Sequence, residues 1–351
     1  MPEKVLIAGN NVRNVAESAA KAGYEVYALT KFSDADLKIY CREVVRIGDS
    51  QPEKEIKKRV EELAESLNLK IVLCSGFETL KIRGELLCNS PELSEKVSNK
   101  LKFYKELEKA GLPFPELLGD NEKGIIKPIK GGGGEDVSIS SRAEKGFLKQ
   151  RFIEGIPCSV SLIASDGKAV PIACNFIYAG WKEMNAHGFR YSGNLTPLAV
   201  EDDVRRELER LAVEAVELFG LTGSVGVDFI LAEKPYILEI NPRFQGSLDS
   251  VEWSSDINIF RMHAEAFEGK LPAKPKTRRF ALRAILFAPE KVEIKENLAG
   301  NPFFADVPDK GAVYQKNDPL VSILATGNSR EEVERKVVKR RDLFLSLAVR
   351  A

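Results

Sequence analysis

Short apolar runs alternate with helix-like stretches through residues 1–90, and this alternation constrains the fold more than any other feature of the sequence. The runs KVLIAG and YEVYAL flank NVRNVAESAAKAG, which has helical spacing and a glycine at its end. EIKKRVEELAESLN followed by LKIVLCSG repeats the pattern. A strand, a helix and another strand in this order predict a parallel sheet with helical crossovers. Only Gly9 stands where a nicotinamide-binding unit needs G-x-G-x-x-G, so that cofactor is disfavoured.

The composition indicates a soluble globular protein with small-molecule partners. The 52 Lys and Arg residues balance the 52 Asp and Glu residues, so no broad basic field favours nucleic acid. No apolar run is long enough for a membrane span and no signal region opens the chain, so we expect a cytoplasmic protein without membrane contact. Five scattered cysteines without a C-x-x-C pair predict free thiols, not a zinc site or disulfides. The sequence is compatible with a homodimer.

The rest of the chain changes texture several times. The stretch 91–110 has helical spacing up to Gly111, and residues 123–178 form short β-like runs typical of a small antiparallel sheet. GSVGVDFIL and YILEINPRF, separated by AEKP, predict a hairpin. The expected units are an N-terminal α/β domain (1–90), a helical connection (91–122), a small lobe (123–178), a large lobe (179–272) and a C-terminal α+β segment (273–351).

Four consecutive glycines follow a lysine-bearing strand in KPIKGGGGED. Residues without side chains let successive N–H groups approach a polyanion, and Lys127 would supply a positive charge beside them. The run lacks the G-K-[ST] ending of a Walker A loop. On the glycines alone, a phosphate cradle and a tight turn or linker remain equal alternatives.

Polar residues interrupt the two apolar strands of the predicted hairpin. Asp228 and Glu239 lie toward the strand centres, and the period of two places Glu239 and Asn241 on one face. Two carboxylates and an amide are hard oxygen ligands that suit Mg²⁺ and the nucleotide phosphates it carries. The alternatives are a solvated hairpin face or an ion pair with a neighbouring arginine.

The segment 180–198 is polar and punctuated by glycines, and we expect a loop there. It contains His187, Arg190, Tyr191 and Asn194. It is either a surface excursion or a lid that presents the planar guanidinium of Arg190 to a substrate carboxylate. His263 lies in an apolar helical pattern and is expected to be structural.

Taken together, the motifs resemble the ATP-grasp superfamily over most of the chain. They are SNKLKFYKELEKAGLPFP, KPIKGGGG, LKQRFIEG and VDFIL followed by LEINPR, in that order. Within the superfamily the chain resembles archaeal-type, biotin-carboxylase-like predicted carboligases. The resemblance implies an α/β ATP-grasp fold with an N-terminal parallel-sheet domain, a small antiparallel lobe and a larger α/β lobe.

The resemblance also assigns roles to residues of this sequence. It implies that the phosphates of ATP contact Lys100, Lys127 and a flap formed by Gly131, Gly132, Gly133 and Gly134, and that adenine lies in a hinge slot lined by Gln150 and Phe152. It also implies that Asp228, Glu239 and Asn241 hold two Mg²⁺ ions (or Mn²⁺), and that Arg243 steadies the transferred phosphoryl group. Two features depart from the pattern. Pro157 replaces a ribose-binding glutamate, and the span 134–150 is short for the usual helix.

The implied activity is a carboxylate–amine ligation in cofactor or small-molecule biosynthesis. ATP would be a substrate that phosphorylates an acid to an acyl-phosphate, and an amine would then displace phosphate. Lys127 and Arg243 are the expected catalytic residues, and the loop 180–198 would hold the organic substrates. The alternatives are a carboxylase that acts through carboxyphosphate and a non-catalytic nucleotide-binding regulator.

Overall fold

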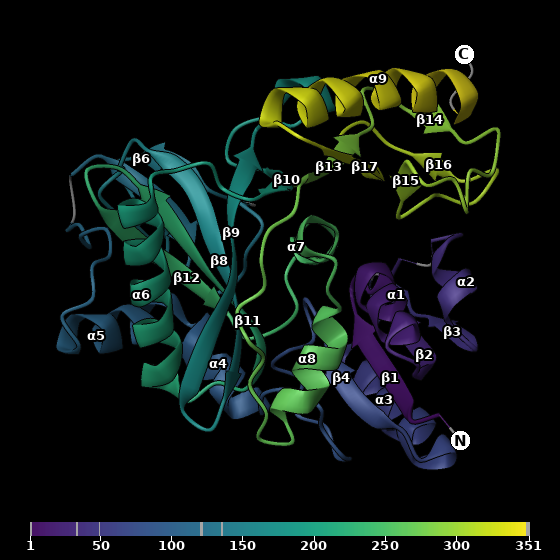
Figure 1. Ribbon diagram of the computed structural model, residues 1–351, viewed down its shortest axis with the longest axis horizontal. Helices are drawn as coiled ribbons and strands as arrows, with labels where there is room; N and C mark the ends of the chain where they lie inside the picture. Colours follow the sequence, from purple (N-terminus) through teal and green to yellow (C-terminus); the bar gives the residue numbers. More distant parts are fainter. Residues whose placement is uncertain (1, 33, 49, 120–121, 135, 349–351) are drawn as a thin grey trace.

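The structure is a computed structural model that describes residues 2–32, 34–48, 50–119, 122–134 and 136–348 (Figure 1). Its strands form an N-terminal parallel sheet, a small three-stranded antiparallel sheet, one large sheet that continues into the C-terminal segment, and a two-stranded sheet within that segment. Within these ranges, no helix is both long enough and apolar enough to cross a bilayer.

The N-terminal domain confirms the predicted parallel sheet. Its strands pair in the order β3-β2-β1-β4, all in parallel. Alternate residues of β1 face opposite sides, so Leu6 packs with α3 while Ile7 packs in the cluster that contains α1. The elements are β1 (Lys4–Gly9), α1 (Arg13–Lys21), β2 (Glu25–Thr30), α2 (Leu37–Tyr40), β3 (Glu43–Arg46), α3 (Glu53–Leu67) and β4 (Lys70–Leu73).

The connection to the next lobe consists of two helices where the sequence predicts one. α4 (Pro91–Ser98) and α5 (Lys100–Lys109) are separated at Asn99, whose backbone is extended. The side chain of Asn99 accepts a hydrogen bond from the backbone N–H of Lys102 and so caps the second helix. The break makes Lys100 the first residue of α5.

The small lobe is a three-stranded antiparallel sheet with the order β6-β5-β7. Its strands are β5 (Gly124–Pro128), β6 (Ser138–Ser140) and β7 (Phe147–Gln150). The glycine run follows β5 directly, between two strands of one sheet. An inter-domain linker at this position is therefore excluded.

The large sheet is wholly antiparallel and has the order β12-β11-β8-β9-β10-β13-β17-β15. The predicted hairpin is confirmed as the pair β11–β12. The strands are β8 (Ile156–Ser165), β9 (Lys168–Ala179), β10 (Tyr191–Thr196), β11 (Gly223–Leu231), β12 (Pro235–Asn241), β13 (Phe280–Phe287), β15 (Phe304–Ala305) and β17 (Pro319–Gly327).

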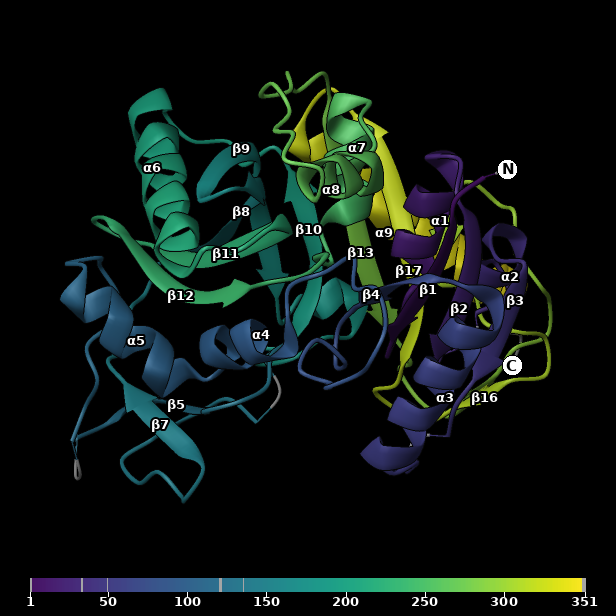
Figure 2. The same ribbon diagram turned by 90° about the horizontal axis from the view of Figure 1, so that it is seen from below.

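β8 and β9 lie in a different sheet from the one expected, since the sequence pattern places residues 123–178 in the small lobe. Both strands lie inside the large sheet, so only the part up to Gln150 forms the small sheet. The reason is burial on two faces: Val160 and Leu162 pack with α6 (Asp202–Phe219), whereas Ile163 packs in the cluster that contains α8 (Ile259–Ala266). Figure 2 shows α6 and α8 on either side of this part of the sheet.

The remaining elements cover the large sheet and its C-terminal extension. α9 lies along the C-terminal strands, as Figure 1 shows. β13, β15 and β17 of the C-terminal segment continue the ladder of the large lobe through β10. The remaining elements are η1 (Lys182–Met184), α6 (Asp202–Phe219), α7 (Leu248–Ser255), α8 (Ile259–Ala266), β14 (Val292–Glu293), β16 (Val313–Tyr314) and α9 (Arg330–Ala348).

Candidate active site

Two carboxylates face each other across the β11–β12 hairpin. Asp228 and Glu239 are direct partners in the register, and we call them the carboxylate pair. Asn241 donates its side-chain N–H to Asp228 Oδ2 at 3.1 Å. The register shifts after Asp228, so Leu238 is an extra residue in β12 and its carbonyl accepts a 2.5 Å hydrogen bond from the Tyr104 hydroxyl. The predicted convergence of Asp228, Glu239 and Asn241 is confirmed.

The carboxylate pair carries an electrostatic conflict. Burial, reinforced by the charge of Glu239, raises the pKa of Asp228 to about 8. Arg243 offsets only part of this effect. A cation placed between the two carboxylates would favour ionisation of both.

The donor set fits Mg²⁺ held jointly with phosphate oxygens. Over the described residues, no group of three or more His, Cys, Asp or Glu side chains is arranged to hold a metal ion. Mg²⁺ commonly binds one or two carboxylates and completes its octahedron with water and substrate phosphates. Two carboxylates and an amide meet that requirement, whereas a closed all-protein cage would need more ligands.

Two buried lysines approach the carboxylate pair. Lys100 Nζ lies 3.4 Å from Glu239 Oε2 and donates a 2.5 Å hydrogen bond to the Gly131 carbonyl. Lys127, on β5, donates to the Tyr104 hydroxyl at 2.7 Å. Burial lowers the pKa of Lys127 to about 7, although the charge of Glu239 acts in the opposite direction. The Lys127 ammonium therefore gives up its proton more readily than an exposed lysine does.

The glycine run folds over the carboxylate pair. A Cβ built on Gly132 would lie 3.9 Å from Glu239 Oε1, and the Gly133 carbonyl accepts from the Tyr191 N–H at 3.1 Å. Gly134 has a φ of +76° and approaches the Phe189 carbonyl so closely that a Cβ would meet it at 2.0 Å. Only glycine fits this position. The run is thus a defined turn that faces the carboxylates.

Arg243 connects this site to the N-terminal domain. It donates to Asn241 Oδ1 at 3.1 Å and to Glu78 Oε1 at 3.0 Å. The other oxygen of Glu78 is buried without a hydrogen-bond partner in the described structure. Sequence reasoning found Arg243 but missed Glu78, which lies in the short SGFETL segment after β4.

The two residues expected in the adenine slot have different environments. Gln150 is fully buried and donates to the Pro115 carbonyl at 2.8 Å, while its Oε1 has no partner among the described residues. Phe152 is 46% exposed, and its ring lies 6.3 Å from that of Phe189. Pro157 pairs with Ile230 inside the large sheet.

The expected loop over 180–198 is wrong for residues 191–196, which form a strand. Tyr191 and Asn194 belong to β10, between β9 and β13. The polar side chains are tolerated because they satisfy one another: Tyr191 donates to Asn194, and Thr196 donates to the Asn175 side chain at 2.7 Å. The lid hypothesis therefore does not apply to this strand.

Arg190 and His187 precede this strand, and their side chains have different surroundings. The Arg190 guanidinium lies 3.9 Å above the Phe287 ring and donates to the Asn317 carbonyl at 2.7 Å. His187 is exposed. Arg190 thus contacts the C-terminal segment in this structure, and its role in holding a substrate carboxylate stays a prediction.

His263 is structural, as predicted. Its Nδ1 accepts from the Ser224 N–H at 2.9 Å and its Nε2 lies 2.8 Å from the Leu87 carbonyl, so Nε2 carries the proton. Burial lowers its pKa to about 4.

The five cysteines are free thiols, as expected.

A second cluster of buried charges joins three parts of the chain, and sequence reasoning missed it. This interdomain network consists of Arg13, Asp36, Asp249, Arg283 and Asp306. Arg13 holds Asp249 through contacts of 3.1 and 2.6 Å and reaches Asp306 at 3.1 Å. Arg283 reaches Asp306 at 2.8 Å. Although burial opposes it, the two arginines hold the pKa of Asp306 well below its usual range.

Comparisons with known proteins agree with the fold. A family model described as an ATP-grasp domain matches residues 97–247. An uncharacterized protein of Methanocaldococcus jannaschii is 29% identical over 93% of this chain and 88% of its own length. A tyramine–L-glutamate ligase of Methanocaldococcus fervens is 36% identical over 35% of this chain and 38% of its own. Biotin carboxylase from Campylobacter jejuni has a similar fold, with a TM-score of 0.75 and 15% identity over 98% of this chain and 91% of that one.

Proposed function

We propose that this protein, which belongs to the ATP-grasp superfamily, uses ATP to join a carboxylic acid to an amine. One observation carries the proposal: Lys100 and the glycine turn converge on Glu239, directly opposite Asp228. This places positive charge, free backbone groups and metal-type ligands around one space. That combination suits a nucleoside triphosphate with its cation.

In this proposal, Lys100, Lys127 and the turn from Gly131 to Gly134 bind the ATP phosphates. Lys100 now bonds to the Gly131 carbonyl and to Glu239, so it would exchange these partners for phosphate oxygens. A polyanion beside Lys127 would raise the depressed pKa of that lysine and keep it charged. Gln150 Oε1 is a buried acceptor without a partner in the described structure and would suit the amino group of adenine.

The carboxylate pair and Asn241 would hold two Mg²⁺ ions, with Mn²⁺ as the alternative. Bound there, the ions would neutralise charge on the transferred phosphoryl group. The raised pKa of Asp228, caused first by burial and then by the charge of Glu239, supports this assignment, because a bound cation would favour the ionised form.

The chemistry needs little covalent help from the protein. A carboxylate oxygen of the acid attacks the γ-phosphorus, the new O–P bond forms, and the bond to the ADP oxygen breaks. The amine nitrogen then attacks the acyl carbon and expels phosphate, so the C–N bond forms with loss of one proton. Arg243, held by Glu78 and Asn241, would steady the transferred phosphoryl group.

The organic substrates would lie beside β10. Tyr191 and Asn194 are the sequence-predicted residues that remain close to the turn and to Arg283, which is opposite Asn194 in the register. The local identity to a tyramine–L-glutamate ligase supports an amine as the second substrate. The similarity to biotin carboxylase is one of fold and does not distinguish the two chemistries.

Release of ADP and phosphate from ATP tests the proposal. Purified protein is incubated with ATP, Mg²⁺ and pairs of amino acids and amines, beginning with glutamate and tyramine, with and without bicarbonate. We expect turnover that requires both an acid and an amine, and a new amide detected by mass spectrometry. Turnover that needs bicarbonate alone would favour the carboxylase. ATP binding without turnover in any arm would favour the regulator.

A further inference from the structure

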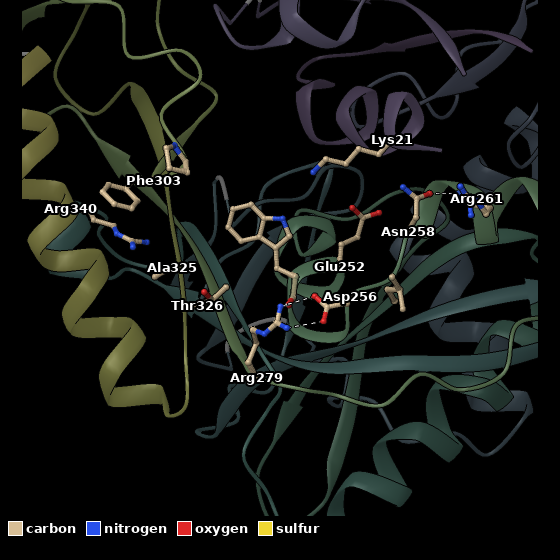
Figure 3. A pocket seen from close by; sticks show the side chains of 13 residues that line it. Lys21, Glu252, Asp256, Asn258, Arg261, Arg279, Phe303, Ala325, Thr326 and Arg340 are labelled. Carbon is tan, nitrogen blue, oxygen red and sulfur yellow. Dashed lines mark hydrogen bonds and ion pairs between the residues drawn. The ribbon is translucent and has the colours of Figure 1, made fainter. Parts of the chain in front are cut away.

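A cavity of about 720 Å³ lies away from the carboxylate pair, where three parts of the chain meet (Figure 3). Its walls come from α1, from α7 with the start of α8, and from β17 and α9 of the C-terminal segment. This volume is in the range of small-molecule sites. None of its lining residues belongs to the site proposed for ATP.

The lining carries more available positive charge than negative charge. The four cations are Lys21, Arg261, Arg279 and Arg340. Arg279 is bound to Asp256 by two hydrogen bonds of 2.6 and 2.8 Å. For Arg261 and Arg340, no carboxylate lies within ion-pair distance in the part of the chain that the structure describes. These two arginines remain available to a ligand.

Arg340 is the better placed of the two. Its guanidinium lies 3.9 Å above the Phe303 ring and donates to the Leu324 carbonyl. A guanidinium has five N–H donors, so most of them are left over after this contact. Burial lowers the pKa of Arg340, which reflects a cation removed from water without a carboxylate beside it.

The acidic groups of the lining are already engaged. Glu252 accepts from the Ser18 hydroxyl at 2.5 Å and from the Ile259 N–H at 2.6 Å. Asp256 is held by Arg279. Trp253 and Phe303 are half-buried and add flat apolar surface. The cavity therefore offers unmatched guanidinium groups next to aromatic rings.

We propose that this cavity binds a small organic anion, whose phosphate or carboxylate group is held by Arg340 and whose planar ring lies against Trp253. Arg261 contributes positive charge from the opposite wall, as Figure 3 shows. Arginine suits both anionic groups because its planar fork matches either one. Such a ligand would connect α9 to α7 across the cavity.

The elements around the cavity also carry the interdomain network. α7 contributes Trp253 to the cavity and Asp249 to the network. β17 contributes Thr326 to the cavity and Ser322, which donates to Asp306. A bound anion would therefore strengthen the docking of the N-terminal domain and act as an effector of the protein.

Intrinsic fluorescence gives a direct test. The sequence contains two tryptophans, so Trp181→Phe leaves Trp253 as the only reporter and keeps an aromatic ring stacked on Tyr178. Phenyl phosphate and benzoate are titrated, with phenol as the neutral control and benzylamine as the cationic control. We expect a saturable change with one or both anions and none with the controls. The preferred anion identifies the group that the site binds.

Substitutions test whether the fluorescence change comes from an anion bound in the cavity. Arg340→Gln should weaken binding of the anion about tenfold or more, because it removes a charge-assisted contact. The side chain of Arg261 is exposed, so Arg261→Gln should weaken binding less. Arg335 is exposed on α9, the helix that carries Arg340, so Arg335→Gln is the matched control and should change the affinity less than about twofold. Lys127→Ala should leave the response unchanged, which distinguishes the cavity from the proposed ATP site.

Two results would overturn the proposal. One is the absence of a saturable signal with either anion in protein that melts cooperatively. The other is sedimentation showing a dimer that Arg340→Gln converts to a monomer, with no anion binding, since the cavity would then be an interface between copies. Both readouts are independent of ligase turnover, so this inference and the proposed function can fail separately.

Discussion

The carboxylate pair and the interdomain network are both buried groups of charges, but they differ in how closely their carboxylates contact a cation. In the network, Asp249 and Asp306 contact arginines directly and the pKa of Asp306 is held well below its usual range, while burial raises the pKa of the more distant Asp36 to about 6. In the carboxylate pair, burial and the charge of Glu239 raise the pKa of Asp228 to about 8. Directly paired charges stabilise the fold, whereas two carboxylates that face each other retain free energy that a bound cation can release.

The sharpest way to break the comparison is to remove Arg13. Arg13→Met removes one of the two arginines that Asp249 and Asp306 share, and we expect the free energy of unfolding to fall by about 3–5 kcal/mol. Arg210→Met is the matched control. Arg210 also pairs with two glutamates, but it is half exposed on α6, so the loss should be below about 1 kcal/mol. Urea denaturation measures both, and equal losses would contradict a structural role for the network.

Glu239→Gln tests the opposite cluster. It keeps the shape of the side chain but removes a charge that the proposed metal site needs, so ADP formation should fall at least about 100-fold. Stability should stay close to that of the parent protein, because relief of the repulsion with Asp228 offsets the loss of the ion pair with Lys100. Glu233→Gln, in the exposed β11–β12 turn, should leave turnover near normal. Near-normal ADP formation in both Glu239→Gln and Asp228→Asn would remove the metal assignment.

Lys127→Ala should weaken ATP binding about tenfold or more, because it removes a charge-assisted contact of roughly 1.5–3 kcal/mol. Isothermal titration calorimetry measures the change. Lys123→Ala, one residue before β5 and exposed, is the control and should bind ATP normally. Unchanged affinity in a folded Lys127→Ala protein would contradict the phosphate assignment.

The same lysine predicts a pH dependence. In the free protein the pKa of Lys127 is lowered to about 7, and a triphosphate should raise it. ATP binding should therefore take up protons above pH 7, and the affinity should decline as the pH rises through 7. Calorimetry in buffers of different ionisation enthalpy measures this uptake. Lys127→Ala should abolish it, and uptake that persists in this variant would assign the proton to another group.

The smallest effect concerns Arg190. Arg190→Gln removes the contact with Phe287 and the hydrogen bond to Asn317, so unfolding should become easier by about 1 kcal/mol. The KM values of ATP and of the organic substrates should stay unchanged, because the side chain is committed to the C-terminal segment. A raised KM for the acid alone would restore the substrate-binding role expected from the sequence.

The sequence predicted those parts of the site whose signals are local. Asp228, Glu239 and Asn241 stand out because they interrupt apolar strands, and the short hairpin turn fixes their register. Lys127 and the glycine run also give a local signal, because they lie close together in the chain. The parallel sheet of the N-terminal domain followed from the alternation of strand and helix patterns.

The parts that sequence reasoning missed depend on distant partners. β10 looked too polar for a core strand because the two side chains that bond to Thr196, those of Asn175 and Ser250, are 21 and 54 residues away. Nothing in the local sequence marks Arg13 as a buried charge, since its partners Asp249 and Asp306 lie 236 and 293 residues further along the chain. Membership of β8 and β9 in the large sheet likewise depended on α6 and α8, which come later in the chain.

The long separation between Arg13 and Asp306 also bears on synthesis of the protein. Translation adds about 5–20 residues per second, so the 293 residues between the two side chains require about 15–60 s. During that interval the guanidinium of Arg13 has no access to Asp306, and the N-terminal domain cannot complete its docking. The nascent domain must therefore wait, with this surface in water, until Asp306 has emerged from the ribosome.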